Sequence, residues 1–243
     1  MIESLRLSSG QVDVWLVDPA SVGEADLLRG EPLLDAVERS RWQALSLAVQ
    51  RRDFLLGRIL LRTTLSLYAA VPPEAWRFGI GQHGRPFVVQ PAFGPPLGFT
   101  LSRTEGLLAL AVASGPEVGV DVEVMRPDID ALTVAKAFFM PTEIADLAQG
   151  PKTSLIERFT TIWTLKEAYI KARGLGVTIP LDGFRFDLAG DTPRIAFDAP
   201  CPDDTERWRF HAEAPTPHHR LAVAYATPHR LDVRLRWVDA FQC

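Results

Sequence analysis

The order of helical and strand-like segments is the sequence feature that most constrains how this chain folds. Apolar residues follow a helical spacing from Pro32 to Val71, and Pro72 and Pro73 end this region. Strand-like segments follow, and a second long helical segment, at about residues 154–173, is again followed by strands. The segments after the first helical region include "WRF" and "LLALAVA". They resemble "FRF" and "RLAVAYA", which follow the second helical region. We therefore expect an α+β fold with an N-terminal half (1–116) and a similar C-terminal half (117–243).

The bulk composition limits the partners that the chain can take. Of its 243 residues, 47% are hydrophobic and 23% are charged, which is ordinary for a globular protein. A net charge of -4 gives no general attraction for nucleic acid or an anionic membrane surface. The first residues lack a secretory pattern, no apolar run could span a membrane, and two cysteines do not build a disulfide framework. We expect a cytoplasmic protein that binds neither nucleic acid nor membrane.

The segment "EVGVDVEVMRP", residues 117–127, reads as a strand with two carboxylates on one face. Side chains alternate along a strand, so Val120, Val122 and Val124 share one face and Asp121 and Glu123 share the other. Two interpretations are open. The carboxylates can belong to an ordinary solvated strand, or they can form part of a site for a hard cation such as Mg²⁺.

The segment "RFTTIWTLKEAYIKARG" reads as an amphipathic helix with charged groups close to its apolar face. Lys166 falls among the apolar residues of that face, which are Phe159, Ile162, Trp163 and Ile170. Lys166 can snorkel with its ammonium group in water, and Glu167 and Lys171 can form an ordinary ion pair across one helical turn. Neither interpretation explains why a carboxylate and two ammonium groups gather on a helix that ends in "GLG".

Together the strand and the helix predict a site for metal and phosphate. Asp121, Glu123 and Glu167 supply carboxylates for one Mg²⁺, and Lys166 and Lys171 supply ammonium groups for phosphate oxygens that share it. Arginine side chains bind phosphate in a bidentate manner, and the upstream cations are Arg41, Arg51, Arg52, Arg85 and Arg103, the last beside Ser102 in "LSRT". This set favours phosphoryl-group chemistry.

A fingerprint of dinucleotide-binding folds also occurs, but its context excludes that fold. Gly79, Gly81 and Gly84 spell G-x-G-x-x-G, which requires a helix N-terminus after the glycines to hold a pyrophosphate. Arg85 and Pro86 instead lead into the strand-like "FVV". No Walker A, H-E-x-x-H or G-x-S-x-G sequence is present, which argues against the common ATPases, zinc proteases and α/β-hydrolases.

Five segments, taken in order, resemble the Sfp-type 4'-phosphopantetheinyl transferases. They are "GRP" (84–86), "FTLSRT" (99–104), "GVDVE" (119–123), "FF" with "TE" (138–143) and "WTLKEAYIKARGLG" (163–176). The most specific part is G-[VI]-D-[VI]-E, followed about forty residues later by W-x-x-K-E-x-x-x-K. The resemblance runs from about Arg39 to Leu188 and covers most of the chain.

The resemblance implies a transferase that moves the phosphopantetheine arm of coenzyme A onto a serine of an acyl or peptidyl carrier protein. The products would be the holo carrier protein and 3',5'-ADP. The resemblance also implies a pseudo-dimer of two similar α+β halves, with coenzyme A in the cleft between them. Because the halves are covalently joined, we expect a monomer.

Site residues follow from the resemblance position by position. Asp121, Glu123 and Glu167 would bind Mg²⁺ with the pyrophosphate, and Lys171 would contact the phosphates. In the expected reaction, Lys171 and Lys166 would assist the leaving group. Glu167 is the candidate base, directly or through a metal-bound water, so that Glu167, Lys171 and Asp121 form the catalytic set. Coenzyme A would also meet a set of residues near the adenosine, its 3'-phosphate and the other phosphates: Arg41, Arg52, Arg85, Ser102 and Arg103.

Three departures from the family pattern concern charged or polar positions. The family often has Lys where Arg85 stands, and often has Asn and His in the stretch where this chain has Thr100 and Arg103. Arg103 can hold a phosphate but cannot act as a neutral imidazole acceptor. Further upstream, a basic residue common in the family is replaced by Glu38, with Arg39 beside it.

The sequence leaves two other functions open, and it does not determine which surface binds the carrier. The chain could be a noncatalytic domain that binds coenzyme A or a nucleotide, or another Mg²⁺-dependent phosphotransferase or nuclease. The segment from Met125 to Gln149 is a candidate docking surface, with Phe138, Phe139 and Met140 near one end. Core packing is the more ordinary interpretation of the two phenylalanines.

Overall fold

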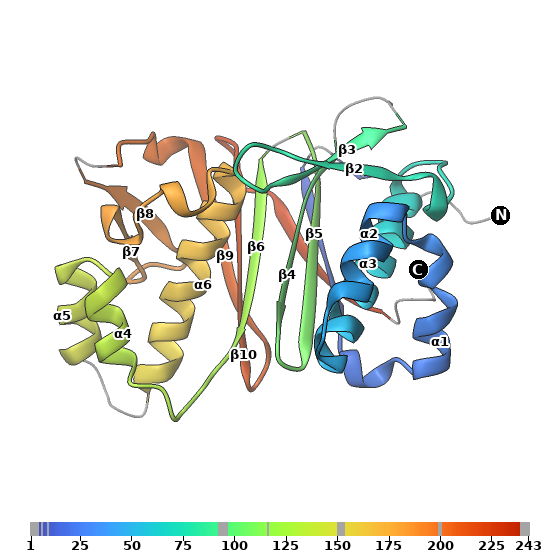
Figure 1. Ribbon diagram of the computed structural model, residues 1–243. Coiled ribbons are helices and arrows are strands. Elements are labelled where there is room, and N and C mark those ends of the chain that lie inside the picture. The colour runs from blue at the N-terminus through green and yellow to red at the C-terminus, as the bar shows by residue number, and fades with distance from the viewer. Residues whose placement is uncertain are drawn as a thin grey trace. The chain divides into compact units, whose positions relative to one another are not determined.

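The computed structural model describes residues 5, 7–8, 10–91, 97–115, 117–149, 154–198 and 201–238 (Figure 1). Helices and strands are mixed along the chain, which confirms the α+β class. The chain forms two compact units. The first consists of Met1–Gly81, Pro86–Gly115 and Leu231–Cys243, and the second of Gln82–Arg85 and Pro116–Arg230. The similarity of two halves split at residue 116 stays a prediction.

A four-stranded sheet in the order β11-β1-β5-β4 forms the centre of the first unit. Its strands are β1 (Gln11–Val17), β4 (Leu97–Thr104), β5 (Leu107–Ser114) and β11 (Asp232–Trp237). β5 is antiparallel to both of its neighbours, whereas β11 runs parallel to β1. A separate two-stranded sheet contains β2 (Arg77–Ile80) and β3 (Pro86–Gln90). The helices are α1 (Glu24–Arg29), α2 (Ala36–Ala44) and α3 (Ala48–Tyr68), with short 3-10 turns at Pro19–Ser21, Glu31–Leu33 and Pro73–Ala75.

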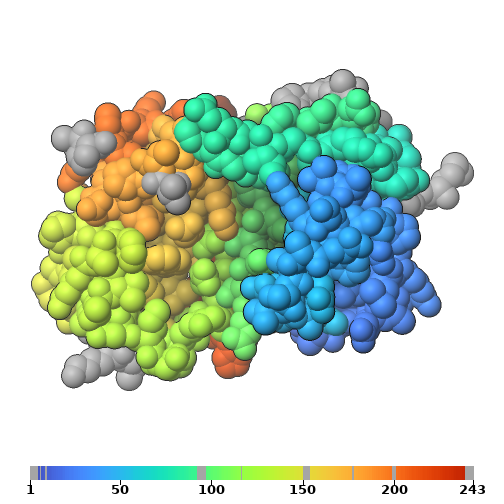
Figure 2. All heavy atoms as spheres, in the orientation of Figure 1, coloured from blue at the N-terminus to red at the C-terminus, as the bar shows by residue number. Residues whose placement is uncertain are grey.

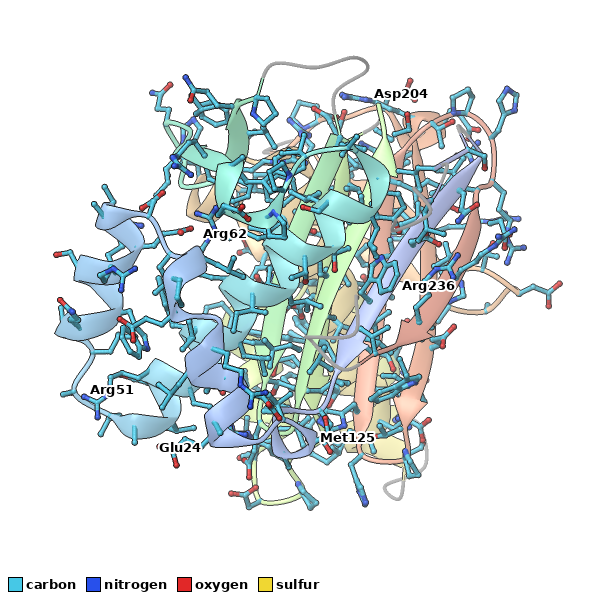
Figure 3. The ribbon with its side chains drawn as sticks, turned by 90° about the vertical axis from the view of Figure 1, so that its right-hand side faces the viewer. Glu24, Arg51, Arg62, Met125, Asp204 and Arg236 are labelled. Atoms are coloured by element: carbon cyan, nitrogen blue, oxygen red, sulfur yellow. The ribbon has the colours of Figure 1, made fainter. Side chains whose placement is uncertain are left out.

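The core of the first unit lies between α3 and one face of this sheet. Leu56, Ile59 and Leu60 of α3 are fully buried in one cluster with Leu108 and Leu110 of β5. Alternation along β5 produces this face, because every second side chain points toward the helix. A buried charge joins the two helices: Arg62 of α3, labelled in Figure 3, donates to Glu38 of α2 at 2.5 Å.

A three-stranded antiparallel sheet in the order β6-β10-β9 forms the centre of the second unit. Its strands are β6 (Val118–Val124), β9 (Trp208–Thr216) and β10 (His219–Ala226). The helices are α4 (Ala131–Phe138), α5 (Pro141–Gln149) and α6 (Leu155–Arg173), and α6 lies along the sheet (Figure 1). β7 (Phe184–Asp187) and β8 (Arg194–Phe197) form a hairpin, and 3-10 turns occur at Gly176–Thr178, Leu181–Gly183 and Thr205–Arg207.

The end of α6 follows the glycine signal in the sequence. Gly174 adopts a left-handed conformation, with φ of 65°, and its N–H group donates to the carbonyls of Ile170 and Lys171. A glycine takes this conformation without the strain that a Cβ atom would add, so "GLG" ends the helix as predicted. The strand β8 was missed by the sequence analysis because it lies in a polar stretch rich in proline.

None of the helices in the described part of the chain combines the length and the hydropathy that crossing a bilayer requires.

Candidate active site

Gly119 lets the strand β6 approach the helix α6 unusually closely. A Cβ atom at this position would lie 2.0 Å from the carbonyl oxygen of Ala168 and 2.5 Å from the backbone nitrogen of Ala172. Ala168 and Ala172 are fully buried and lie one turn apart on α6. Small residues on both elements therefore bring the two backbones together. The next side chain on this face of β6, Asp121, is held against the helix as a result.

Asp121 forms an ion pair with Lys171 that joins β6 to α6. The carboxylate of Asp121 is 3% exposed, and its Oδ1 atom accepts a hydrogen bond from Nζ of Lys171 at 2.7 Å. The sequence left open whether Lys171 pairs only with Glu167 on its own helix. The structure shows that Lys171 also bonds to a carboxylate of the neighbouring strand.

Glu167 lies one turn before Lys171 and shares this environment. Its pKa is raised above the usual value for a glutamate, first by burial and second by the negative charge of Asp121, while the ammonium group of Lys171 lowers it. The three side chains thus form a group of two carboxylates and one ammonium. We call Asp121, Glu167 and Lys171 the carboxylate-lysine cluster.

Glu123 occupies the same face of β6 two residues beyond Asp121 and lines a cavity. The cavity has a volume of about 270 Å³, and its walls come from β6, the following loop, α4 and α6: Glu123, Val124, Arg126, Ile129, Val134, Phe159, Thr160 and Trp163. In the sheet register Glu123 stands opposite Arg220, which pairs with Glu157 of α6 at 2.6 Å. Glu123, the third predicted metal ligand, therefore borders an open space.

A Mg²⁺ ion fits the chemistry of the carboxylate-lysine cluster. Burial and, after it, the negative charge of Asp121 raise the pKa of Glu167, and a divalent cation between the two carboxylates relieves such repulsion. Two carboxylates with phosphate oxygens and water satisfy Mg²⁺. Among the described residues, no group of three carboxylate, His or Cys side chains is already arranged to hold a metal ion. Glu123 as a third ligand stays a prediction.

Lys166 lies in the core of the second unit, away from solvent. Its Nζ atom pairs with Glu143 of α5 at 2.8 Å and donates to the carbonyl oxygens of Leu181 at 2.8 Å and Phe184 at 2.5 Å. These contacts use the three N–H donors of an ammonium group. The predicted phosphate contact of Lys166 does not fit this geometry, nor does snorkelling to water, since the residue is fully buried.

Glu143 is a structural residue that the sequence analysis quoted in a motif without giving it a role. Its Oε1 atom accepts from the backbone N–H of Phe186 at 2.9 Å, and its Oε2 atom accepts from the backbone N–H of Met140 at 3.0 Å. Together with Lys166, this carboxylate ties α5, α6 and β7 to one another. A polar residue directly after a helix start in "PTE" was the available signal.

Arg85 bridges the end of α6 and the start of β6. It donates to the carbonyl of Ala172 at 2.6 Å and to the carbonyl of Val118 at 3.2 Å. Its side chain passes over Gly174, where a Cβ atom would lie 2.8 Å from the Cδ atom of Arg85. Burial lowers the pKa of the Arg85 guanidinium. These contacts hold the loop at 82–85 against the same two elements that carry the cluster.

The other predicted coenzyme contacts lie in the first unit. Arg52 of α3 donates to the backbone carbonyls of Pro19 and Val22. Arg103 is exposed near Asp53, and burial raises the pKa of Asp53 while Arg103 and Arg52 lower it. Their position relative to the cluster stays a prediction.

Ser102 and Arg41 complete the set of predicted coenzyme contacts. Ser102 is 6% exposed and, as the neighbour of Arg103 in β4, points to the opposite face of the sheet. The two side chains therefore cannot approach one group from the same face of the strand. Arg41 is exposed near the end of α2.

Comparison with known proteins assigns the chain to a family. Residues 117–226 match the 4'-phosphopantetheinyl transferase superfamily. The chain is 33% identical over 174 residues to the 4'-phosphopantetheinyl transferase HetI of Nostoc sp., an alignment that covers 72% of this chain and 73% of HetI. The chain belongs to the 4'-phosphopantetheinyl transferase family. Its activity is that of a transferase, and the noncatalytic alternative is not favoured.

Two further relatives of this transferase support the resemblance to the Sfp type. A 4'-phosphopantetheinyl transferase of Bacillus subtilis is 29% identical over 215 residues, which cover 88% of this chain and 91% of that protein. The 4'-phosphopantetheinyl transferase Sfp of Bacillus subtilis strain 168 is 29% identical over 174 residues, which cover 72% and 74%. The family predicted from the motifs is thus confirmed.

The two phenylalanines at the end of α4 have different environments in this transferase. Phe139 is 3% exposed and stacks on Phe159 with ring centroids 5.4 Å apart, so it is a core residue. Phe138 is 43% exposed and meets Trp163 edge-on at 5.7 Å. Figure 2 shows the segment that contains α4 and α5, in yellow-green, at the surface of the second unit. Only Phe138 is therefore placed to contact a partner.

Proposed function

We propose that this transferase moves the phosphopantetheine arm of coenzyme A onto a serine of an acyl or peptidyl carrier protein and releases 3',5'-ADP. The observation that carries the proposal is the carboxylate-lysine cluster. Asp121 of β6 and Lys171 of α6 form an ion pair at 2.7 Å, and Glu167 lies within the influence of both charges. The three residues come from the two motifs that identified the family.

The proposed chemistry joins the serine oxygen to the β-phosphorus of coenzyme A. The bond from this phosphorus to the bridging oxygen breaks, and 3',5'-ADP leaves with the bonding electrons. Glu167 accepts the proton of the serine hydroxyl. Lys171 stabilises the charge that develops on the phosphate oxygens, and Asp121 holds its ammonium group in place. Asp121, Glu123 and Glu167 would hold Mg²⁺, which when bound neutralises the charge of the pyrophosphate.

The remaining parts of the proposal concern binding. Coenzyme A would lie between the two halves of a pseudo-dimer, with its phosphates and adenosine near Arg41, Arg52, Arg85, Ser102 and Arg103. Phe138 and the surrounding segment from Met125 to Gln149 would contact the carrier. We propose a cytoplasmic monomer that binds neither nucleic acid nor membrane.

The test is the intact mass of an apo carrier protein after incubation with the protein, coenzyme A and Mg²⁺. We expect a gain of one phosphopantetheine group that disappears when the metal is chelated. Glu167→Gln, Asp121→Asn and Lys171→Ala should each lower the single-turnover rate, whereas Arg29→Ala, an exposed position on α1 outside the proposed site and docking segment, should not. An unchanged carrier mass would contradict the substrate, and near-normal rates in all three variants would contradict the assigned site.

A further inference from the structure

A second cavity of the second unit is lined by three arginines. It has a volume of about 500 Å³ and lies among β8, the 3-10 turn at Thr205–Arg207, β9 and the ends of β10 and its following loop. The walls consist of Thr192, Pro193, Arg194, Ile195, Thr205, Glu206, Trp208, Arg209, Phe210, Tyr225 and Arg230. Asp204, labelled in Figure 3, caps the 3-10 turn by accepting from the backbone N–H of Glu206 at 2.9 Å. We call this space the arginine cavity.

The sheet register places Arg209 of the arginine cavity and Asp121 of the carboxylate-lysine cluster on opposite faces of the sheet. Arg209 pairs with Tyr225, and Tyr225 pairs with Val118, so these side chains share one face of the sheet. Val118 lies three residues before Asp121, and strand side chains alternate, so Asp121 points to the face opposite to Arg209. Phe210 of the cavity wall pairs with Ala224, opposite Gly119, and so shares the face of Asp121, but β10 lies between its strand β9 and β6. No lining residue of the arginine cavity is a member of the cluster.

Arg209 is held in a fixed orientation by backbone oxygens. It donates to the carbonyls of Glu206 at 2.9 Å, Trp208 at 2.8 Å and Pro228 at 3.0 Å. A guanidinium group carries five N–H donors, so two remain for other partners. Its nearest carboxylate, that of Glu206, is 3.7 Å away and is 86% exposed. The positive charge of Arg209 is therefore oriented but weakly neutralised.

Arg194 and Arg230 add two more positive charges to the same walls. Both side chains are exposed, and within the described part of the chain neither forms an ion pair. Asp187 stands opposite Arg194 in the β7-β8 register, but no ion pair joins them. The lining thus carries three guanidinium groups and one carboxylate, Glu206. This arrangement creates an excess of positive charge in a concave, polar space.

We propose that the arginine cavity binds a small polyanion that carries a diphosphate or polyphosphate group. Guanidinium groups match phosphate oxygens with paired hydrogen bonds, and the hydroxyl groups of Thr192 and Thr205 add donors at the rim. A volume of about 500 Å³ lies in the range of small-molecule sites. The site is separate from the proposed catalytic cluster and does not depend on it.

The experiment measures binding of inorganic pyrophosphate to the full chain by titration calorimetry in buffer without divalent metal. The double variant Arg194→Gln/Arg230→Gln removes two charges from the arginine cavity. Arg29→Gln/Arg234→Gln removes two exposed arginines elsewhere and serves as the matched control. We expect the Kd of the cavity site to rise at least tenfold in the first double variant and to change less than twofold in the second. Equal effects in the two variants, or no binding to the unmodified chain, would overturn the proposal.

Hydrogen exchange and activity distinguish the arginine cavity from the catalytic cluster. Pyrophosphate should slow amide exchange over residues 205–211 in the unmodified chain and not in Arg194→Gln/Arg230→Gln. Protection limited to β6 and α6 would contradict the separate site. The cavity variant should also retain the transfer rate and the KM for coenzyme A. A parallel loss of both would assign the arginines to the coenzyme and overturn the proposal.

Discussion

At the scale of single residues, the distance between two backbones determines the chemistry of the cluster. Gly119 and the alanines of α6 allow β6 and α6 to approach, and this approach places the buried Asp121 within 2.7 Å of Lys171. The interaction energy of two charged groups this close depends strongly on the distance between them. A change of one small side chain should therefore alter the site without altering any charged residue.

Replacing Gly119 by alanine should both destabilise the protein and slow transfer. The new Cβ atom would lie 2.0 Å from the backbone oxygen of Ala168. This oxygen belongs to the backbone of α6 and cannot move aside as the end of a flexible side chain could. Overpacking of this kind costs about 1–3 kcal/mol or more. Gly190→Ala, where the nearest atom is 3.9 Å away, is the matched control. Urea unfolding and single-turnover transfer measure the two effects, and equal results for both variants would contradict the close approach.

Replacing Lys171 by alanine should show how much the cluster depends on its ammonium group. The carboxylate of Asp121, 3% exposed, would lose a charged partner, at a cost of about 1–3 kcal/mol. Loss of one electrostatic stabiliser of the developing charge should lower the transfer rate by about 10²-fold or more. Lys171→Arg, which keeps the charge, should recover part of the stability. An unchanged rate in Lys171→Ala, measured in single turnover, would remove Lys171 from the catalytic set.

At the scale of secondary-structure elements, a buried ion pair holds the helices of the second unit together. Lys166 and Glu143 are 0% and 2% exposed, and their contacts join α5, α6 and β7. Removing one partner of such a pair leaves an uncompensated charge, whereas removing both is much less costly. Single and double variants of this pair can therefore distinguish a structural role of Lys166 from the phosphate contact predicted from the sequence.

Lys166→Met should destabilise the protein by about 3–5 kcal/mol, because Glu143 would stay buried without its cation. The double variant Glu143→Gln/Lys166→Met should recover part of that loss. Once folded, the double variant should keep a nearly normal KM for coenzyme A, because Lys166 contacts protein oxygens. Urea unfolding and steady-state kinetics check both points. A large rise in KM in a stable double variant would restore Lys166 as a phosphate ligand.

Asp203 gives the second unit a stability that depends on pH. It accepts from Tyr169 and Trp208, both at 2.8 Å, and pairs with Arg173, so it ties a loop to α6. Burial raises the pKa of Asp203, but these hydrogen bonds and Arg173 outweigh it, so that the pKa lies below its usual value. Because the folded pKa is depressed, the ionised group stabilises the fold at pH well above about 4 and ceases to do so as the pH falls through the folded pKa.

Asp203→Asn should therefore lower the free energy of unfolding by about 1–2 kcal/mol at neutral pH. The difference from the unmodified protein should shrink as the pH falls below about 4, because the unmodified aspartate then becomes protonated. Asp191→Asn, an exposed position, is the control. Urea unfolding between pH 7 and pH 3 measures the effect. A difference that stays constant over this range would show that the charge of Asp203 does not contribute.

At the scale of the whole molecule, local patterns predicted more than distant pairings did. The alternation of "VGVDVEV" indicated which face of β6 is polar, and the valines at 118, 120 and 122 are fully buried. The end of α6 at Gly174 was also predictable, since glycine conformation is a local property. The partner of Lys166 was not, because it lies on another helix. The parallel pairing of β11 with β1 was equally hidden, since it joins opposite ends of the sequence.

That pairing makes the last strand part of the first unit. β11 pairs with β1, and Arg236 of β11, labelled in Figure 3, bonds to the buried Asp13 of β1 at 3.1 Å. A chain that ends after Arg230 would leave β1 as an exposed edge with its backbone groups unpaired. We expect it to melt at a lower temperature than a chain that ends after Val238 and keeps β11, and to aggregate more readily. Differential scanning calorimetry of both chains tests this. Equal melting temperatures would show that β11 is dispensable for the stability of the first unit.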